Sequence, residues 1–162
     1  HLFLSDNAMS DFRTFARLQP PLRQEDDRQA CLAAIVDWTI DVIASGHDPR
    51  GPEDKRLPFA DAAPGMAGAE TLLAFSLNLV RDGHIDMARL FELLAANPAR
   101  ILKVESGTLQ PGAEADIILV DDGSPWIVDS DKMAATAGNT PFDGLPVQGR
   151  VTGMWKGGQR IR

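Results

Sequence analysis

The chain has 162 residues, 44% of them apolar and 24% charged, which is the composition of a soluble globular protein with a real core. Its formal net charge is −7 and its 16 basic residues are scattered, which argues against a nucleic-acid binder. No apolar run approaches the roughly 20 residues that span a membrane, and no basic segment followed by an apolar stretch suggests a secretory signal.

The first part of the chain alternates between irregular and regular segments. Residues 1–23 contain "LQPPLR", whose paired prolines exclude regular helix. The apolar spacing and acidic first turn of residues 24–38 predict a helix. A short strand is predicted over Thr39–Ala44, followed by a loop over 45–70. Loops of that length are uncommon unless they have a function or are disordered.

Helices and then strands are predicted in the rest of the chain. One helix over 70–83 ends at Gly83, a second over 86–96 has Asp86 as N-cap, and a third over 97–102 has Asn97 as cap and Pro98 at its first position. The predicted β-type runs are 115–121, 126–129, 147–155 and 159–162, with "KGGQ" at 156–159 as a hairpin turn. The change in texture places a boundary at residue 107.

Metal-binding and nucleophilic motifs are weak. The only histidines are His1, His47 and His84, with no H-x-H or H-E-x-x-H, so no metal site is expected from this chain alone. We interpret His84 as a solvated turn residue. Cys31, in a predicted helix, is interpreted as structural; being the single cysteine, it favours a reducing, cytoplasmic setting. Ser45 has no G-x-S-x-G frame.

Two segments of the long loop have alternative interpretations. The amides of "PGMAG", residues 64–68, can bind an anion, although turn glycines are the commoner explanation. The charges of "PEDKR", residues 52–56, are interpreted as a solvated loop. Composition and spacing alone therefore predict an α/β domain with one candidate loop, "SGHDPRG", at residues 45–51.

Motifs along nearly the whole chain carry a resemblance. In chain order, these motifs are "HLFLSD", "QPPLR", "TIDVIAS", "PF..AAPG..G.ETLL", "ELLA.NPARIL", "ADIILVD", "NTPF" and "GRV". In this order they resemble the dihydroorotases of the amidohydrolase superfamily. Hydantoinases and allantoinases are similar more distantly.

The resemblance implies a fold and an activity. It implies an α/β protein, with residues 1–106 as the last strands and helices of a metal-dependent (β/α)₈ TIM-type barrel and residues 107–162 as the C-terminal part of a small β-rich domain. Such proteins interconvert dihydroorotate and carbamoyl-aspartate in pyrimidine biosynthesis, using a zinc-bound hydroxide. A barrel needs about 250 residues. We therefore expect the H-x-H pair and the N-terminal part of the barrel to lie outside this chain, which alone should be inactive and expose apolar surface.

The resemblance also assigns roles within the loop. The family sequence Asp-His-Ala-Pro-His corresponds to "GHDPR", so Gly46 stands in place of the catalytic Asp and Arg50 in place of the His that holds the substrate carboxylate. Arg50 can still hold a carboxylate. Gln19 replaces the Asn of "NPPLR", and Pro64 and Gly65 match the backbone segment that contacts substrate.

Asp48 is the candidate substitute for the missing catalytic carboxylate. Two residues along an extended chain share a face but lie about 6.5 Å apart, so substitution requires a rearranged loop. Pro49 restricts Asp48 to extended conformations.

Two hypotheses remain open. The parent protein is an active dihydroorotase in which Asp48 and Arg50 take over the missing roles, or it is a non-catalytic dihydroorotase-like structural partner of aspartate transcarbamoylase.

Overall fold

The computed structural model describes residues 1–161 and begins with short helical turns that lead into a longer helix. The 3₁₀ segments η1 (Asp6–Phe12) and η2 (Thr14–Ala16) precede α1 (Glu25–Val36). Three acidic residues in the first turn of α1 complement the helix dipole, as the sequence predicted. The helix buries Leu32 and Ile35 in a core cluster with residues of three later segments.

Residues 39–44 do not form the predicted strand. The segment is extended, but no strand pairs with it in the described part of the chain. Its backbone is held instead by the amide of Ile43, which donates to Leu93 O, and by the side chains of Arg89 and Asn97, which donate to Ile40 O and Asp41 O. A strand requires a neighbouring strand, and none lies beside this segment among the described residues; the one nearby bridge joins His47 to Met66.

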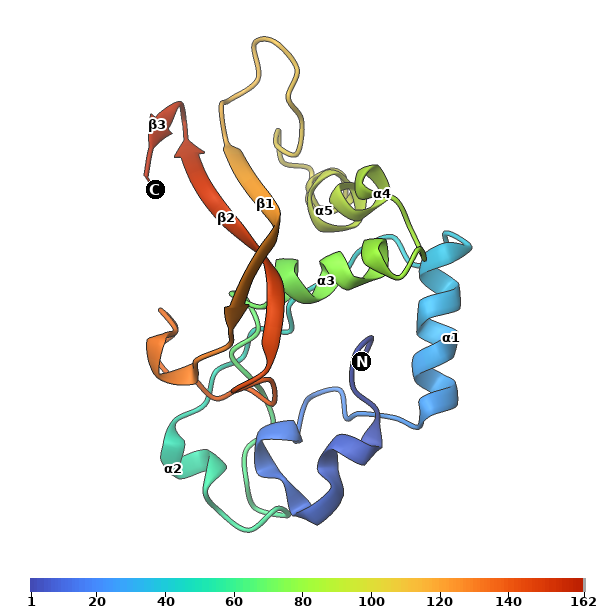
Figure 1. Ribbon diagram of the computed structural model, residues 1–162, viewed down its shortest axis with the longest axis vertical. Coiled ribbons are helices and arrows are strands. Elements are labelled where there is room, and N and C mark those ends of the chain that lie inside the picture. The colour runs from blue at the N-terminus through green and yellow to red at the C-terminus, as the bar shows by residue number, and fades with distance from the viewer. Residues whose placement is uncertain (162) are drawn as a thin grey trace.

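The helix α3 (Leu72–Arg81) confirms the helix predicted over 70–83 and is the most buried element. In Figure 1 it runs from the β-ribbon towards α1. Phe75 packs against Phe142 with ring centroids 4.0 Å apart. This contact and the cluster around it join the helical part of the chain to the β-rich part. The short helix α2 (Pro52–Lys55) lies in the long loop.

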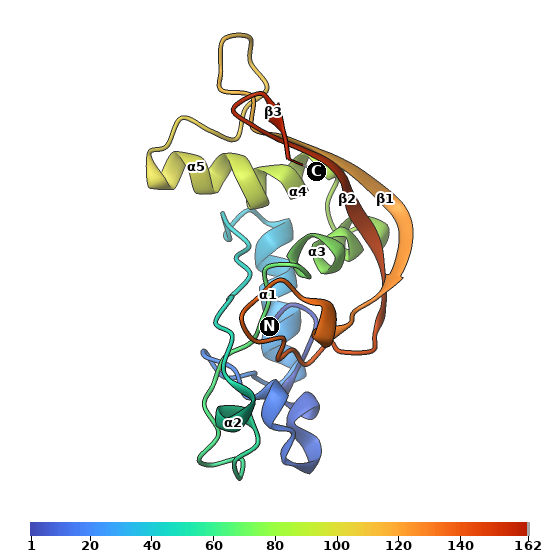
Figure 2. The same ribbon diagram turned by 90° about the vertical axis from the view of Figure 1, so that its left-hand side faces the viewer.

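The two helices predicted over 86–102 form one continuous rod. It consists of α4 (Met87–Phe91), a π-helical segment η3 (Glu92–Ala96) and α5 (Asn97–Leu102), as Figure 2 shows. Asp86 is the N-cap, as predicted, and accepts a hydrogen bond from Arg89 N. The prediction of Asn97 as a cap was wrong, because Asn97 is itself helical. A proline clashes with the carbonyl four residues earlier, and the wider π turn before Pro98 accommodates it.

The C-terminal part forms a three-stranded antiparallel sheet in the order β1 (Ile117–Ile127), β2 (Pro146–Lys156), β3 (Gln159–Arg160). The predicted runs 115–121 and 126–129 belong largely to one strand, interrupted by a bulge between Asp121 and Pro125. The predicted hairpin at 156–159 is confirmed by the pairing of Lys156 with Gln159. A 3₁₀ turn, η4 (Ser130–Lys132), follows β1.

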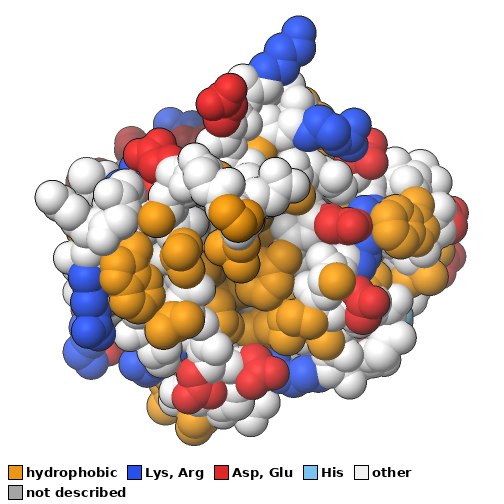
Figure 3. Space-filling model, turned by 90° about the horizontal axis from the view of Figure 1, so that it is seen from above, with side chains coloured by type: hydrophobic (Ala, Val, Ile, Leu, Met, Phe, Trp, Pro, Cys, Tyr) orange, Lys and Arg blue, Asp and Glu red, His pale blue; other side chains and the backbone are white. Residues whose placement is uncertain are grey.

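Apolar side chains remain exposed, as expected. Figure 3 shows them gathered in a broad patch on the face seen from above. The most exposed include Leu102 and Leu109, at 71% and 79% of their surface. None of the helices in residues 1–161 is long and apolar enough to cross a membrane.

Candidate functional site

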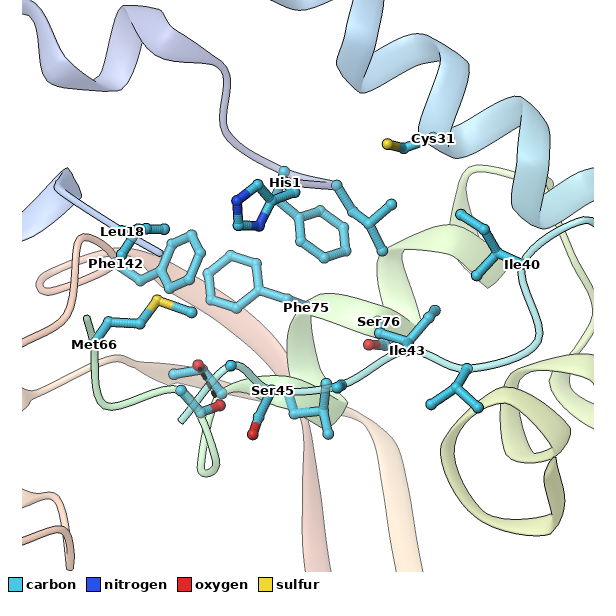
Figure 4. A pocket seen from close by; sticks show the side chains of 18 of the residues that line it. His1, Leu18, Cys31, Ile40, Ile43, Ser45, Met66, Phe75, Ser76 and Phe142 are labelled. Carbon is cyan, nitrogen blue, oxygen red and sulfur yellow. Dashed lines mark hydrogen bonds between the residues drawn. The ribbon is translucent and has the colours of Figure 1, made fainter. Parts of the chain in front are cut away.

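A cavity of about 270 Å³ lies between the N-terminal segment, α1, the extended segment 40–46 and α3. Its walls are mostly apolar, and Figure 4 shows the rings of Phe75 and Phe142 side by side within it. Three of the positions to which the resemblance gives a role meet here, because Gln19, Gly46 and Gly65 all line the cavity. These residues are up to 46 positions apart in the chain, so the fold brings them together. His1, Cys31 and Ser45 line the cavity as well.

Gly46 has the backbone of a left-handed residue, with φ of +59°. A Cβ placed there meets no atom within 4 Å, so the position has room for a side chain. Left-handed backbone strains most L-residues, although Asp and Asn adopt it more readily than others. Glycine offers no side chain that can bind a metal or move a proton at this point of the cavity wall.

The next residue, His47, fastens the loop to the following turn. Its Nδ1 accepts hydrogen bonds from Gly68 N and Ala69 N, each 3.2 Å long. The lone pair of Nδ1 is therefore used internally, and in the neutral ring the proton then sits on Nε2. His47 is a structural anchor in this conformation.

The two unusual side chains of the loop bind each other. Arg50 Nη2 lies 2.5 Å from Asp48 Oδ2, and Arg50 Nε donates to Pro64 O over 3.0 Å. The side chains are 40% and 49% exposed, and neither lines the cavity. Gly65 is required here, since a Cβ would stand 2.4 Å from Asp48 O. The ion pair and the Arg50–Pro64 hydrogen bond thus hold the loop against the 64–66 turn.

Asn139 is a site residue for which the sequence analysis assigned no role. Its buried side chain accepts a hydrogen bond from Arg50 N at 2.8 Å and donates to Gly65 O at 3.1 Å. Its own carbonyl accepts from Ala67 N. The one available signal was its position at the start of the "NTPF" block. Asn139 connects the C-terminal part of the chain to the loop.

Lys55 corrects the interpretation of "PEDKR" as a solvated loop. Its side chain is 0% exposed, whereas its neighbours in the segment are exposed. The ammonium donates to Thr14 O, Arg17 O and Ala63 O at 3.1, 3.0 and 2.9 Å. Loss of hydration lowers the pKa of Lys55 to about 8, and nearby Arg17 and Arg50 act in the same direction.

Three amides of residues 64–68 donate to internal acceptors. Gly65 N donates to Arg17 O, Ala67 N to Asn139 O and Gly68 N to His47. These bonds favour the interpretation of the "PGMAG" glycines as turn residues over anion binding. His84 lies exposed in the turn after α3, as predicted.

The donor set present does not fit a zinc site. No cluster of three or more His, Cys, Asp or Glu side chains that can hold a metal occurs among residues 1–161. Gly46 lacks a donor, and His47 Nδ1 is occupied. We therefore derive no chemical step through a metal from these residues.

Comparison with known proteins gives a consistent picture. The model of the family described as "Amidohydrolase family" matches residues 26–161. Proteins named dihydroorotase from Geobacter metallireducens and Syntrophus aciditrophicus are 42% and 41% identical over 162 and 152 residues, covering 99% and 93% of this chain. The chain spans 38% and 36% of their lengths.

Solved structures of similar shape are known. The L-hydantoinase (dihydropyrimidinase) of Arthrobacter aurescens superposes with a TM-score of 0.91 at 27% identity, over 99% of this chain and 37% of its own. The dihydropyrimidinase of Brevibacillus agri gives 0.89 at 22% identity with the same coverage, a likeness of fold alone.

Proposed function

The chain belongs to the amidohydrolase family, and from this we propose that its parent protein is a dihydroorotase-like protein of pyrimidine biosynthesis whose 46–50 loop is not catalytic. The predicted α/β fold class, the C-terminal portion of a (β/α)₈ barrel with part of a small β-rich domain, is confirmed with the family. The division into residues 1–106 and 107–162 stays a prediction. So does the cytoplasmic location.

One observation carries the non-catalytic function: Gly46 leaves no carboxylate at the cavity wall, and the nearest substitute, Asp48, is paired with Arg50. A general base must reach the group that it deprotonates, by about 3 Å or through one water. Asp48 does not line the cavity. We propose that such a protein serves as a structural partner of aspartate transcarbamoylase, the preceding enzyme of the pathway.

An active dihydroorotase is the second candidate. Asp48 and Arg50 are each about half exposed, so their ion pair competes with water and costs little to open. Once open, Arg50 would hold the carboxylate of dihydroorotate or carbamoyl-aspartate, and Asp48 would take up the proton. Under both candidates, Gln19, Pro64 and Gly65 are the proposed contacts of a dihydroorotate-type ligand, whether or not the protein converts it. Any zinc would be held by residues outside this chain.

The deciding experiment uses the full-length protein, stripped of metal and reconstituted with zinc. We expect no hydrolysis of dihydroorotate by the wild type or by Asp48→Ala, and measurable turnover in Gly46→Asp, because this change restores a carboxylate at the cavity wall. Bound metal is measured in each variant. Asp54→Ala, which removes an exposed carboxylate of the same long loop, is the control.

The opposite pattern supports the second candidate. Wild-type turnover that drops at least about 100-fold in Asp48→Ala, but not in Asp54→Ala, would establish Asp48 as the base. Co-elution of the inactive wild type with aspartate transcarbamoylase tests the structural role directly.

A further inference from the structure

We propose that Lys55 is a positioning residue, which sets the spacing between the backbone segments 14–19 and 62–66. These segments carry Gln19, Pro64 and Gly65. The inference rests on the proposed function only in taking those three residues as contacts of a dihydroorotate-type ligand.

The geometry of the ammonium supports this role. Lys55 Nζ has three protons and three backbone acceptors: Thr14 O and Arg17 O on one segment, and Ala63 O on the other. Arg17 precedes Gln19 by two residues, and Ala63 directly precedes Pro64. One buried cation therefore fixes the distance between the two strips of backbone that border the cavity.

Neighbouring bonds tighten the same junction. Arg17 O accepts from both Lys55 Nζ and Gly65 N, the latter over 3.0 Å, and the Arg17 guanidinium donates to Ala62 O. A shift of Lys55 therefore moves the Gly65 turn directly. Gly65 is also the residue that has no room for a Cβ beside Asp48.

The presence of a charged side chain at the buried position 55 indicates a role beyond packing. No described carboxylate forms an ion pair with Lys55, and the charged groups around it are Arg17, Arg50 and Asp48. A buried ammonium without a paired carboxylate opposes folding, and apolar side chains often replace buried charges without loss of stability. What an apolar residue cannot do is hold three carbonyl groups around one point.

The test compares Lys55→Met, which keeps most of the length of the side chain but removes the donors, with Lys103→Met at the exposed end of α5. Both are made in the full-length protein. We measure hydrogen exchange of peptides covering 12–19 and 60–68, and the affinity of the metal-free protein for dihydroorotate. In Lys55→Met we expect exchange at Gly65 to accelerate and affinity to fall, each at least about 10-fold. Lys103→Met should change neither.

Each further outcome decides a different point. Unchanged exchange at Gly65 in folded Lys55→Met overturns the positioning role. If exchange at Gly65 accelerates in Lys55→Met but even the wild type does not bind dihydroorotate, the positioning role of Lys55 stands. Dihydroorotate is then not the ligand, and the proposed function fails on that point. If Lys55→Met does not fold, Lys55→Arg decides by the same readouts: its larger donor group should alter exchange at Gly65, and unchanged exchange together with unchanged affinity would overturn the proposal.

Discussion

The cavity side of the molecule and the β-sheet are held together in different ways. In the sheet, β1 and β2 satisfy each other's backbone groups by a long antiparallel ladder with two register shifts. Around the cavity, the backbone of residues 39–66 depends in part on single side chains. Arg89, Asn97 and Asn139 donate to its carbonyl groups from other segments, and Lys55 donates to Ala63 O from within it.

The two arrangements differ in how much stability the protein loses when one hydrogen bond is removed. A ladder distributes its stability over many bonds, so the loss of one is small. A loop fixed by a few buried polar side chains depends on each of them, because every lost partner leaves a buried group unsatisfied. We therefore expect single substitutions around the cavity to have larger effects than comparable ones in the sheet.

The largest effect is expected for Gly65→Ala. The new Cβ would lie 2.4 Å from Asp48 O, at a φ of +128°. Backbone strain and overpacking together predict a loss of about 4 kcal/mol in the free energy of unfolding. Gly144→Ala, in the β-rich part, has a similarly positive φ of +76° but open space, and should lose about 1 kcal/mol. Denaturant unfolding of the full-length variants measures both, and equal losses would contradict the comparison.

The second effect is a dependence on pH. Because burial lowers the pKa of Lys55 to about 8, the folded protein releases this proton before the unfolded chain does. Below pH 8 the group is protonated in both states and the cost of burying the charge is fully present. Between pH 8 and pH 10 the unfolded state binds more protons, so stability should rise, by about 2 kcal/mol from this group.

The matched measurement is the difference between the wild type and Lys55→Met at each pH. The charged groups near Lys55, which are Arg17, Arg50 and Asp48, are present in both proteins, so their contribution is common to the two measurements. If the difference in the free energy of unfolding stays constant from pH 8 to pH 10, the prediction is contradicted. The fold would then not lower the pKa of Lys55.

The smallest effect is expected in the sheet. Trp126 Nε1 donates to Gly149 O over 2.9 Å, and Trp126→Phe removes that bond while keeping most of the ring. A loss of about 1 kcal/mol is expected, since one partly buried hydrogen bond is removed. Trp155→Phe in β2 is the control and should lose less. A loss in Trp126→Phe as large as that in Gly65→Ala would remove the distinction between the two regions.

Local sequence signals predicted the elements well where each element is satisfied by its own residues. The acidic start of α1, the Asp86 cap and the glycine hairpin at 157–158 are short-range features, and all three were found. The predictions failed where a distant residue decides the state. Asn97 reads as a cap but lies within a helix and binds Asp41 O, and residues 39–44 read as a strand but are bound by side chains.

The candidate site shows the same division. Composition and spacing alone predicted the α/β class. The order of motifs gave the family resemblance and the prediction that Gly46 stands in place of the expected Asp, because these depend only on which residue stands where. The tertiary structure decided that Asp48 pairs with Arg50, that Asn139 bridges the loop, and that Lys55 is buried. Burial and pairing depend on atoms brought together from distant positions, and a charged residue in a loop has the same local sequence whether it ends in water or in the core.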